Sequence, residues 1–453
     1  MSVDLDEILD IISLSNQMAG RITLATILMI LVGVGPLVLF TCTTVGVDAE
    51  TKHAYRADAN IDNFETENPP NTCSGGETPC DEGDNLESDM LENSGDSIPA
   101  IDDGEFKWDP KGYVLFCPCM GRFGNQGEHY LGAMAFAKAL DRTLVLPPFR
   151  TFKHASFGQL FETEPIKEFQ RTILMEDFME HLAPKYWPPG KRIGYAHLPL
   201  KSETPCEMKI GNPFDSFWNY FKVDFDDCIK YEIYNFADAS DERSLQKMKE
   251  KWHARFPPEK HPVLALRGSP GSYPMLAGNR YLQKYLKWSP AFFADAGKYI
   301  RKTFKDEGFV GIHLRNGIDW ERACEHADGI GRFMASPQCL EKTPGAIVTK
   351  DLCLPSLEQI LNLTSQLFNK VQAKHLYIAT DRKPHTDSFK KLLNPQGVSV
   401  HHLNPSQAET DLMILGQADF FIGNCISSFT SFVKRERDVN GRPSAFWSRD
   451  LEL

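Results

Sequence analysis

The sequence contains 11 cysteines but no paired C-x-x-C motifs, and this absence argues against a zinc ribbon. It also lacks a basic stripe and a recognisable nucleic-acid-binding motif, which argues against nucleic acid as a partner. The formal net charge of −12 is local, because residues 48–106 hold 17 acidic residues against Lys52 and Arg56, a net charge of −15. The rest of the chain therefore sums to +3, a balance that suits a nucleotide ligand.

Charged residues are absent from residues 22–47, a run long enough to span a bilayer. One interpretation is a signal anchor, in which residues 1–21 form a short cytoplasmic tail and the chain is a single-pass type II membrane protein. The alternative is a signal peptide on a chain that starts at Met18, with cleavage near Val47-Asp48-Ala49. Both interpretations place the rest in the lumen of the secretory pathway, where scattered cysteines form disulfides.

The acidic stretch that follows, residues 48–104, is rich in Asn, Gly, Ser and Pro and has almost no apolar periodicity. This composition predicts a disordered stem, in which Cys73 and Cys80 could pair. From there the chain has the pattern of a globular protein. We expect two Rossmann-like domains, one over residues 105–288 and a donor-binding one over residues 289–453.

The first domain opens with an apolar run at 113–116, a glycine loop from Gly121 to Gln126, and a helical pattern over about 127–140. A second apolar run follows at 143–146, so these segments predict a βαβ unit. A glycine loop before a helix presents free N–H groups and can bind an anion, with Arg122 as an added cation and the amides of Asn125 and Gln126 as sugar or hydroxyl ligands. The alternative is a plain turn.

Later segments continue the alternation of strands and helices, which predicts a parallel, doubly wound α/β sheet with ligands at the carboxyl ends of its strands. The expected strands are 263–266, 309–314, 376–380, 398–400 and 420–422, and the expected helices are 291–304, 354–374, 411–417 and 427 to about 437.

The loop after residue 314 begins with Arg315, which is placed to neutralise a pyrophosphate. The alternative is a structural ion pair with Asp319. His313 precedes this loop, and a lone histidine there is more often a hydrogen-bonded core residue. After residue 422, Ser427 and Ser428 are helix caps or phosphate ligands. Asp411 is either an acid in a first helical turn or an acceptor for the N1–H and N2–H of guanine.

Asp224-Phe225-Asp226 matches the D-x-D pattern of metal-dependent sugar transferases. It lies in a polar stretch and closes no convincing strand, so we do not expect it to bind a metal.

Three motifs together resemble the protein O-fucosyltransferase 1 family: Gly121 to Gln126, His313-Leu314-Arg315 with Asp319-Trp320, and Cys425 to Phe429 leading to Lys434-Arg435-Glu436-Arg437-Asp438. The resemblance runs from about Trp108 to Trp447. It implies a two-domain GT-B glycosyltransferase and inverting transfer of L-fucose from GDP-fucose, without a metal cofactor. The implied acceptor is a Ser or Thr hydroxyl of a folded EGF-like repeat, as in Notch-type receptors, in the endoplasmic reticulum.

The resemblance also assigns roles to residues. Arg315 matches the family's essential arginine, and Asn125 matches its amide near the acceptor hydroxyl. Glu128 and Asp319 are carboxylates nearby in the sequence, but the sequence assigns the role of general base to neither. Asp319 and Arg437 are supporting candidates. The implied GDP-fucose contacts are Arg122, Phe123, Gly124, Asn125, Gln126, His313, Leu314, Arg315, Asp411, Ser428 and Phe429.

The implied disulfides are Cys117–Cys119, Cys324–Cys353 and Cys339–Cys425. The resemblance implies a fourth disulfide with Cys206, but its second position matches Ala196, so Cys206 pairs with Cys228 or stays free. The only clear glycosylation sequon is Asn362-Leu363-Thr364. The terminal Asp450-Leu451-Glu452-Leu453 loosely matches an endoplasmic reticulum retrieval signal.

Two rival functions remain open at this point. The acceptor could be a thrombospondin-type repeat, although the Gly-Arg-Phe-Gly-Asn-Gln form argues against it. The protein could also be a non-catalytic folding helper for EGF repeats, against which the presence of Arg315 and Asn125 argues.

Overall fold

The computed structural model describes residues 106–447, except 151–153, 202, 212, 233–236 and 342. The expected tail, leader and stem and the terminal retrieval signal therefore lie outside the described residues. Within the described part, no helix combines the length and the apolarity needed to cross a membrane.

The first sheet has six strands, all parallel, with β1 and β8 at its centre. Every residue of these two strands is buried, which is why they appear in the sequence as uninterrupted apolar runs. The strand order is β5 (Thr172–Leu174), β2 (Thr143–Leu146), β1 (Tyr113–Phe116), β8 (Val263–Leu266), β6 (Ile193–His197) and β7 (Asp227–Tyr231).

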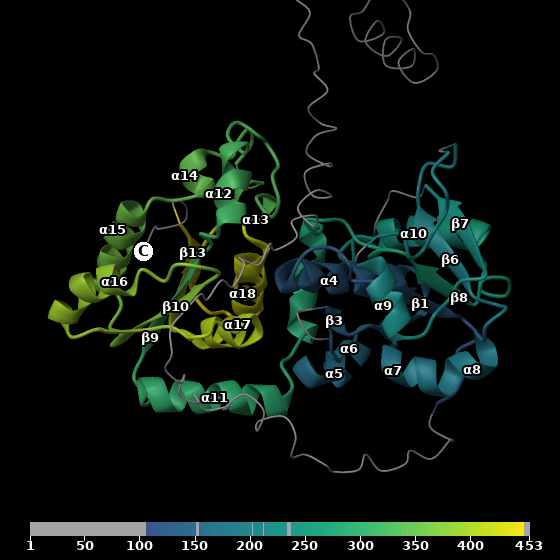
Figure 1. The fold of residues 1–453 in the computed structure, drawn as a ribbon, viewed down its shortest axis with the longest axis horizontal. Helices are drawn as coiled ribbons and strands as arrows, with labels where there is room; N and C mark the ends of the chain where they lie inside the picture. Colours follow the sequence, from purple (N-terminus) through teal and green to yellow (C-terminus); the bar gives the residue numbers. More distant parts are fainter. Residues whose placement is uncertain are drawn as a thin grey trace, which may run out of the picture. The chain divides into compact units, whose positions relative to one another are not determined.

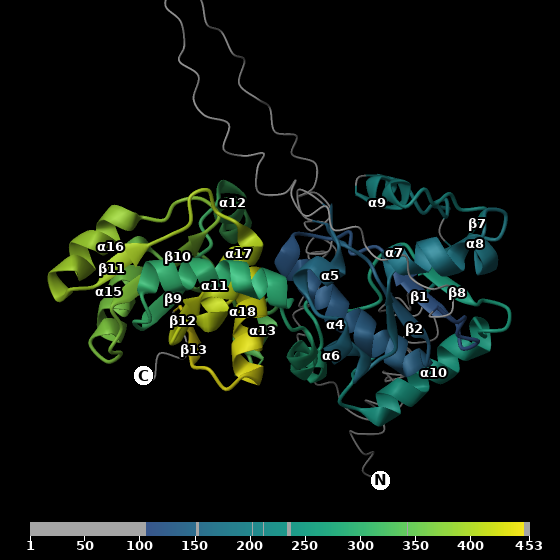
Figure 2. The ribbon, with the colours of Figure 1, turned by 90° about the horizontal axis from the view of Figure 1, so that it is seen from below.

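Two hydrophobic cores cover the faces of this sheet. One contains Phe136 of α4 and Trp252 of α10, and the other contains Phe178 and Trp218, so α4 and α10 lie on the side opposite α8 and α9 (Figure 2). The helices are α4 (Phe123–Leu140), α5 (Phe157–Leu160), α6 (Glu164–Lys167), α7 (Met175–Asp177), the π-helix η2 (Phe178–Leu182), α8 (Ala183–Tyr186), α9 (Phe214–Tyr220), α10 (Glu242–Arg255) and the 3₁₀ helix η3 (Ala277–Tyr285); β3 (Phe149–Arg150) and β4 (His154–Ala155) form a small hairpin.

The second sheet has five parallel strands in the order β11 (Ser399–His401), β10 (His375–Thr380), β9 (Phe309–Leu314), β12 (Phe420–Gly423) and β13 (Ser444–Phe446). Helices α15 (Leu357–Phe368) and α16 (Thr386–Leu393) cover one face, and α17 (Ala408–Gln417) and α18 (Ser428–Val439) cover the other (Figure 1). Helix α11 (Pro290–Phe304) packs against α17. The remaining helices are α12 (Ile318–Glu325), α13 (Pro337–Leu340), α14 (Lys350–Cys353) and η4 (Asn394–Gln396).

The structure confirms the prediction of α/β architecture with two parallel, Rossmann-like sheets. Three predicted helices had wrong boundaries, including the helix expected from Asp411, which begins at Ala408. The first helix starts at Phe123 and not near 127, so the glycine motif forms its first turn. The helix expected over 354–374 is shorter, because Ser356 begins it with a capping box and it ends before Asn369. Several elements were not predicted, among them helices α10, α12 and α16 and strands β5, β6, β7 and β13.

Candidate active site

Helices α4 and α18 pack side by side and run parallel. A β-carbon at Gly124 would lie 2.6 Å from the backbone nitrogen of Phe429, and one at Gly127 would lie 2.7 Å from the ring of Phe432. These contacts advance along both helices in the same direction, so the two N-termini lie together. Each N-terminus carries unpaired N–H groups and a partial positive charge. Their juxtaposition creates a place where an anion such as a phosphate is stabilised.

Asn125 and Ser428 link the first turns of these two helices. The Ser428 hydroxyl donates a hydrogen bond to Oδ1 of Asn125, and the Tyr273 hydroxyl donates to the same oxygen at 3.5 Å. Asn125 and Ser428 are both partly exposed. Because Oδ1 is the acceptor, the amide nitrogen of Asn125 is directed away from Ser428.

One turn further along, Glu128 and Arg435 form a buried ion pair between the same helices. Their closest atoms are 3.1 Å apart, and the side chains are 2% and 4% exposed. Glu128 also accepts from the Ser431 hydroxyl at 3.0 Å and from the backbone nitrogen of Met275 at 3.0 Å. Both carboxylate oxygens are therefore engaged, and Glu128 joins the two helices rather than facing a ligand.

Arg315 lies at the carboxyl end of β9, between two carboxylates. Its guanidinium donates to Oδ2 of Asp319 at 2.6 Å and to Asp381, which follows β10. It also lies over the ring of Trp320, 5.0 Å from the centroid. The ion pair considered from the sequence is thus present, and it fixes the orientation of Arg315. A guanidinium has five N–H donors, so these bonds leave donors for an anion.

Asp319 remains charged in this position. Burial tends to raise the pKa of its carboxyl group, but the hydrogen bond and charge of Arg315, with a contribution from Arg122, outweigh burial and lower the pKa. Arg122 is an exposed cation at the start of α4. Because its charge acts on the carboxyl group of Asp319, Arg122 lies in the same region as Arg315.

His313 is a buried residue beside this region, 3% exposed. Its Nδ1 forms a 2.7 Å hydrogen bond with the Thr430 hydroxyl, and its ring packs on Phe429, with centroids 4.5 Å apart. Burial, and then the charge of Arg315, lower the pKa of His313 to about 3. The imidazole is therefore neutral at physiological pH, and it supports the first turn of α18 without adding charge.

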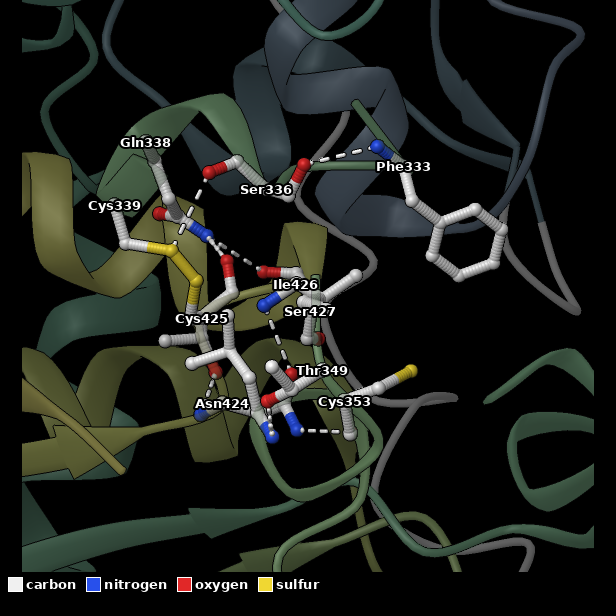
Figure 3. Close-up of a disulfide and its surroundings, with 12 residues drawn as sticks. Phe333, Ser336, Gln338, Cys339, Thr349, Cys353, Asn424, Cys425, Ile426 and Ser427 are labelled. Carbon is white, nitrogen blue, oxygen red and sulfur yellow. Dashed lines mark hydrogen bonds between the residues drawn. A yellow bond between two sulfur atoms is a disulfide. The ribbon is translucent and has the colours of Figure 1, made fainter. Parts of the chain in front are cut away.

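The loop that leads into α18 is held by a disulfide and by hydrogen bonds to backbone carbonyls. Cys425 pairs with Cys339, and the amide of Gln338 donates to the carbonyls of Cys425 and Ser427 (Figure 3). The amide of Asn424 donates to the Cys353 carbonyl at 2.7 Å.

The same Cys353 carbonyl accepts a hydrogen bond from the indole of Trp320 at 3.0 Å. Cys353 also pairs with Cys324, at the other end of α12. These residues belong to a small separate core that includes Ile426. The helix that carries Asp319 and Trp320 is thereby tied to the loop that positions Ser428.

Several residues implied as ligand contacts have their side chains elsewhere. Phe123 stacks on Phe149 in the core, and Leu314 is buried in the core under α15. The side chain of Gln126 binds the backbone N–H and C=O of Arg150. The side chain of Arg437, a supporting candidate, donates to the backbone carbonyls at the end of α17. Arg437 is therefore a structural residue of the fold.

Asp411 is also turned inward, at 2% exposure. It accepts hydrogen bonds from the hydroxyls of Tyr377 and Ser406. Burial raises the pKa of its carboxyl group to about 6, although both hydrogen bonds oppose this shift. In this structure the carboxylate is not presented to a guanine edge.

Asp224 and Asp226 each have a structural partner. The Asp224 carboxylate binds Lys209, and Oδ2 of Asp226 accepts from the backbone nitrogen of Arg192 at 2.8 Å. Cys206 pairs with Cys228, one of the two outcomes left open by the sequence, and Cys117 pairs with Cys119.

Sequence reasoning missed Asp381 and Tyr273 as members of this site. Asp381 directly follows the strand β10, and its position at the carboxyl end of a parallel strand was the signal that could have found it. Tyr273 lies in the irregular segment before η3, and nothing in its sequence context marks it.

Comparisons with known proteins match this chain to one family. A family model described as GDP-fucose protein O-fucosyltransferase matches residues 113–440. A Caenorhabditis elegans protein, GDP-fucose protein O-fucosyltransferase 1, is 39% identical over 356 residues, which cover 75% of this chain and 90% of that protein.

Solved structures give the same result. The apo form of POFUT1 matches with a TM-score of 0.68 and 37% identity, covering 76% of this chain and 99% of that one. POFUT1 in complex with GDP-fucose matches with a TM-score of 0.69 and 38% identity, covering 76% of this chain and 100% of that one.

Proposed function

This chain belongs to the GDP-fucose protein O-fucosyltransferase family, and we propose that it transfers L-fucose from GDP-fucose to a Ser or Thr hydroxyl of folded EGF-like repeats. The observation that best supports a nucleotide-sugar site is the contact between Gly124 and Phe429. It brings two helix N-termini together beside Arg315, whose cation is suited to a diphosphate.

The donor would lie with its diphosphate at the N-termini of α4 and α18. Arg315 would bind the β-phosphate and the glycosidic oxygen, and Arg122 would add a second positive charge. Because negative charge develops on the leaving diphosphate, a cation that is already oriented by Asp319 and Asp381 stabilises the transition state more than the ground state.

The acceptor hydroxyl would attack the anomeric carbon from the face opposite the diphosphate, with inversion. Asn125 would orient that hydroxyl, because the bond from Ser428 fixes the plane of its amide. The engaged carboxylate of Glu128 is not available as a general base. A dissociative transition state with strong oxocarbenium character reduces the need for such a base.

We also propose that the reaction needs no metal ion. Arg315 and the helix N-termini supply the positive charge that a metal would otherwise supply to the diphosphate. The disulfide pairs, the resemblance and the apolar run at 22–47 support a location in the lumen of the endoplasmic reticulum, with membrane anchoring as one possible form of the leader.

An acceptor assay tests this proposal. The secreted protein is incubated with GDP-fucose, EDTA and either a folded EGF-like repeat or a folded thrombospondin-type repeat, and the product is measured by mass spectrometry. Fucose on the EGF-like repeat alone is the expected result. Fucose on the thrombospondin-type repeat alone would overturn the acceptor class, and loss of transfer with EDTA would overturn metal independence. Binding of GDP-fucose without transfer would favour a non-catalytic folding helper.

A further inference from the structure

Helix α15 carries a modification motif on its exposed side. Asn362-Leu363-Thr364 has the N-x-T form of an N-glycosylation acceptor, and it is the only clear sequon of the chain. Asn362 is exposed, and its amide oxygen accepts a 3.4 Å hydrogen bond from Gln366, one turn later. In the described part of the chain, the Asn362 side chain makes no other hydrogen bond.

An apolar groove of about 490 Å³ lies at the same position, between α15 and α16. Asn362 is one of its lining residues, together with Leu357, Glu358, Leu361, Ser365 and Leu392. The three leucines are only partly buried. A partly exposed apolar surface of this kind is stabilised when something covers it.

We propose that Asn362 carries an N-linked glycan, and that the first N-acetylglucosamine covers this groove. The sugar has an apolar face of C–H groups and an acetamido methyl group, and its attachment point is part of the groove wall. This proposal rests on the secretory location proposed above, but not on the transferase activity.

The covalent step is a glycosyl transfer from a lipid diphosphate-linked oligosaccharide. A bond forms between Nδ2 of Asn362 and C1 of the first N-acetylglucosamine, and the bond from C1 to the diphosphate oxygen breaks. The amide nitrogen loses one proton to a base of the transferring enzyme, and the lipid diphosphate leaves.

The structure also determines when this step occurs. Residues i and i+2 of a helix point to different sides, and Thr364 is fully buried, with its hydroxyl donated to the Ile360 carbonyl at 2.7 Å. An enzyme that must contact both Asn362 and Thr364 therefore cannot read the sequon in the folded protein. Modification precedes folding of α15.

Occupancy is tested first, with the full chain expressed in cells that keep glycans in high-mannose form. The wild-type protein and Thr364→Ser should show a mobility shift that glycosidase treatment removes, and Asn362→Gln should not. Alkylation of free thiols reports entry into the secretory pathway separately. A disulfide-bonded wild-type chain without glycan would overturn this proposal alone, and a reduced chain without glycan would overturn the location as well.

The groove contact is tested by trimming the glycan to a single N-acetylglucosamine and comparing the product with Asn362→Asp. The trimmed protein should unfold at a temperature about 1–2 °C higher. The same comparison in a Leu361→Ser background should give no difference. An equal difference in both backgrounds, or none in either, would show that the sugar does not cover the groove.

Timing is tested with unglycosylated, folded protein and a peptide of residues 355–370, both offered to the purified oligosaccharide-transferring enzyme. Modification of the peptide at least tenfold faster than the folded chain is expected. Equal rates would overturn the order of the two events.

Discussion

Gly124 on α4 faces the backbone of α18 so closely that a β-carbon at this position would lie 2.6 Å from the nitrogen of Phe429 and 2.6 Å from the carbonyl carbon of Ser428. The obstacles are backbone atoms, which no rotation of a side chain can move aside. The distance between the two helix N-termini therefore depends on the absence of a single methyl group.

Gly124→Ala should push α4 and α18 apart. Overpacking of this kind costs about 1–3 kcal/mol of unfolding free energy. The larger effect should be on the donor, because separation of the N-termini weakens both of the anion-binding helix ends. We expect kcat/KM for GDP-fucose to fall by about 10²-fold or more, since misplacement by about 1 Å has such effects.

Gly158→Ala is the matched control, because a β-carbon there meets only Leu174 at an ordinary contact distance of 3.4 Å. Steady-state kinetics and urea unfolding of both variants check this prediction. Unchanged kinetics in Gly124→Ala would mean that the helix contact does not shape the donor site.

Arg315→Lys should lose most activity although the charge is kept. Lysine is a compact cation that cannot bind Asp319 and Asp381 with a planar fork, so its ammonium group is not oriented toward the diphosphate. We expect kcat to fall by about 10²–10³-fold, as for removal of one preorganised donor. Arg315→Ala should abolish transfer.

Arg301→Lys, at an exposed position on α11, is the control for charge-conserving replacement. Turnover is measured at saturating GDP-fucose. If Arg315→Ala kept near-normal turnover, Arg315 could not be the group that stabilises the leaving diphosphate.

Two disulfides of similar loop length should behave differently when removed. Cys324–Cys353 spans 29 residues and Cys206–Cys228 spans 22, so either double alanine variant should lose about 3–4 kcal/mol of unfolding free energy. Only loss of Cys324–Cys353 should raise KM for GDP-fucose, because Cys353 links α12 to the loop before α18. An equal change in KM in both variants would contradict this link.

His313 should make the protein less stable in acid. Its pKa is about 3 in the folded protein, against 6.5 for an ordinary histidine. As the pH falls from about 6.5 toward 3, the unfolded chain binds a proton here that the native protein does not, so the free energy of unfolding decreases.

His313→Gln should reduce the pH dependence in this range by at most about 1.4 kcal/mol per pH unit. Urea unfolding of the wild-type protein and of His313→Gln between about pH 5 and about pH 7 measures both slopes. An unchanged slope in His313→Gln would mean that His313 takes up a proton in the folded state.

The sequence predicts those parts of the fold whose structure depends on their own residues rather than on contacts with distant parts of the chain. The strands at 113–116, 263–266 and 309–314 are buried on both faces, so the first two are unbroken apolar runs and the third is interrupted only by His313. Strands such as β7 have exposed and partly buried residues, and they are defined by pairing with β6 rather than by their own composition.

In the candidate site, too, some residues could be predicted from the local sequence and others could not. Arg315 could be selected because it directly follows the strand β9, and Asn125 because its glycine motif follows the first strand and matches a family motif. The buried partners of Glu128 and the enclosure of Asp411 could not be predicted, because they depend on residues up to 307 positions apart that meet only in the folded chain. The backbone partners of Gln126 and Arg437 could not be predicted for the same reason, since a polar side chain can bind backbone groups as well as a ligand.

The most direct test of the account is a crystal structure of the protein soaked with GDP-fucose. We expect the diphosphate to lie at the N-termini of α4 and α18, within hydrogen-bond distance of the Arg315 guanidinium, with the fucose toward Asn125. A nucleotide sugar bound elsewhere, with Arg315 contacting only Asp319 and Asp381, would contradict it.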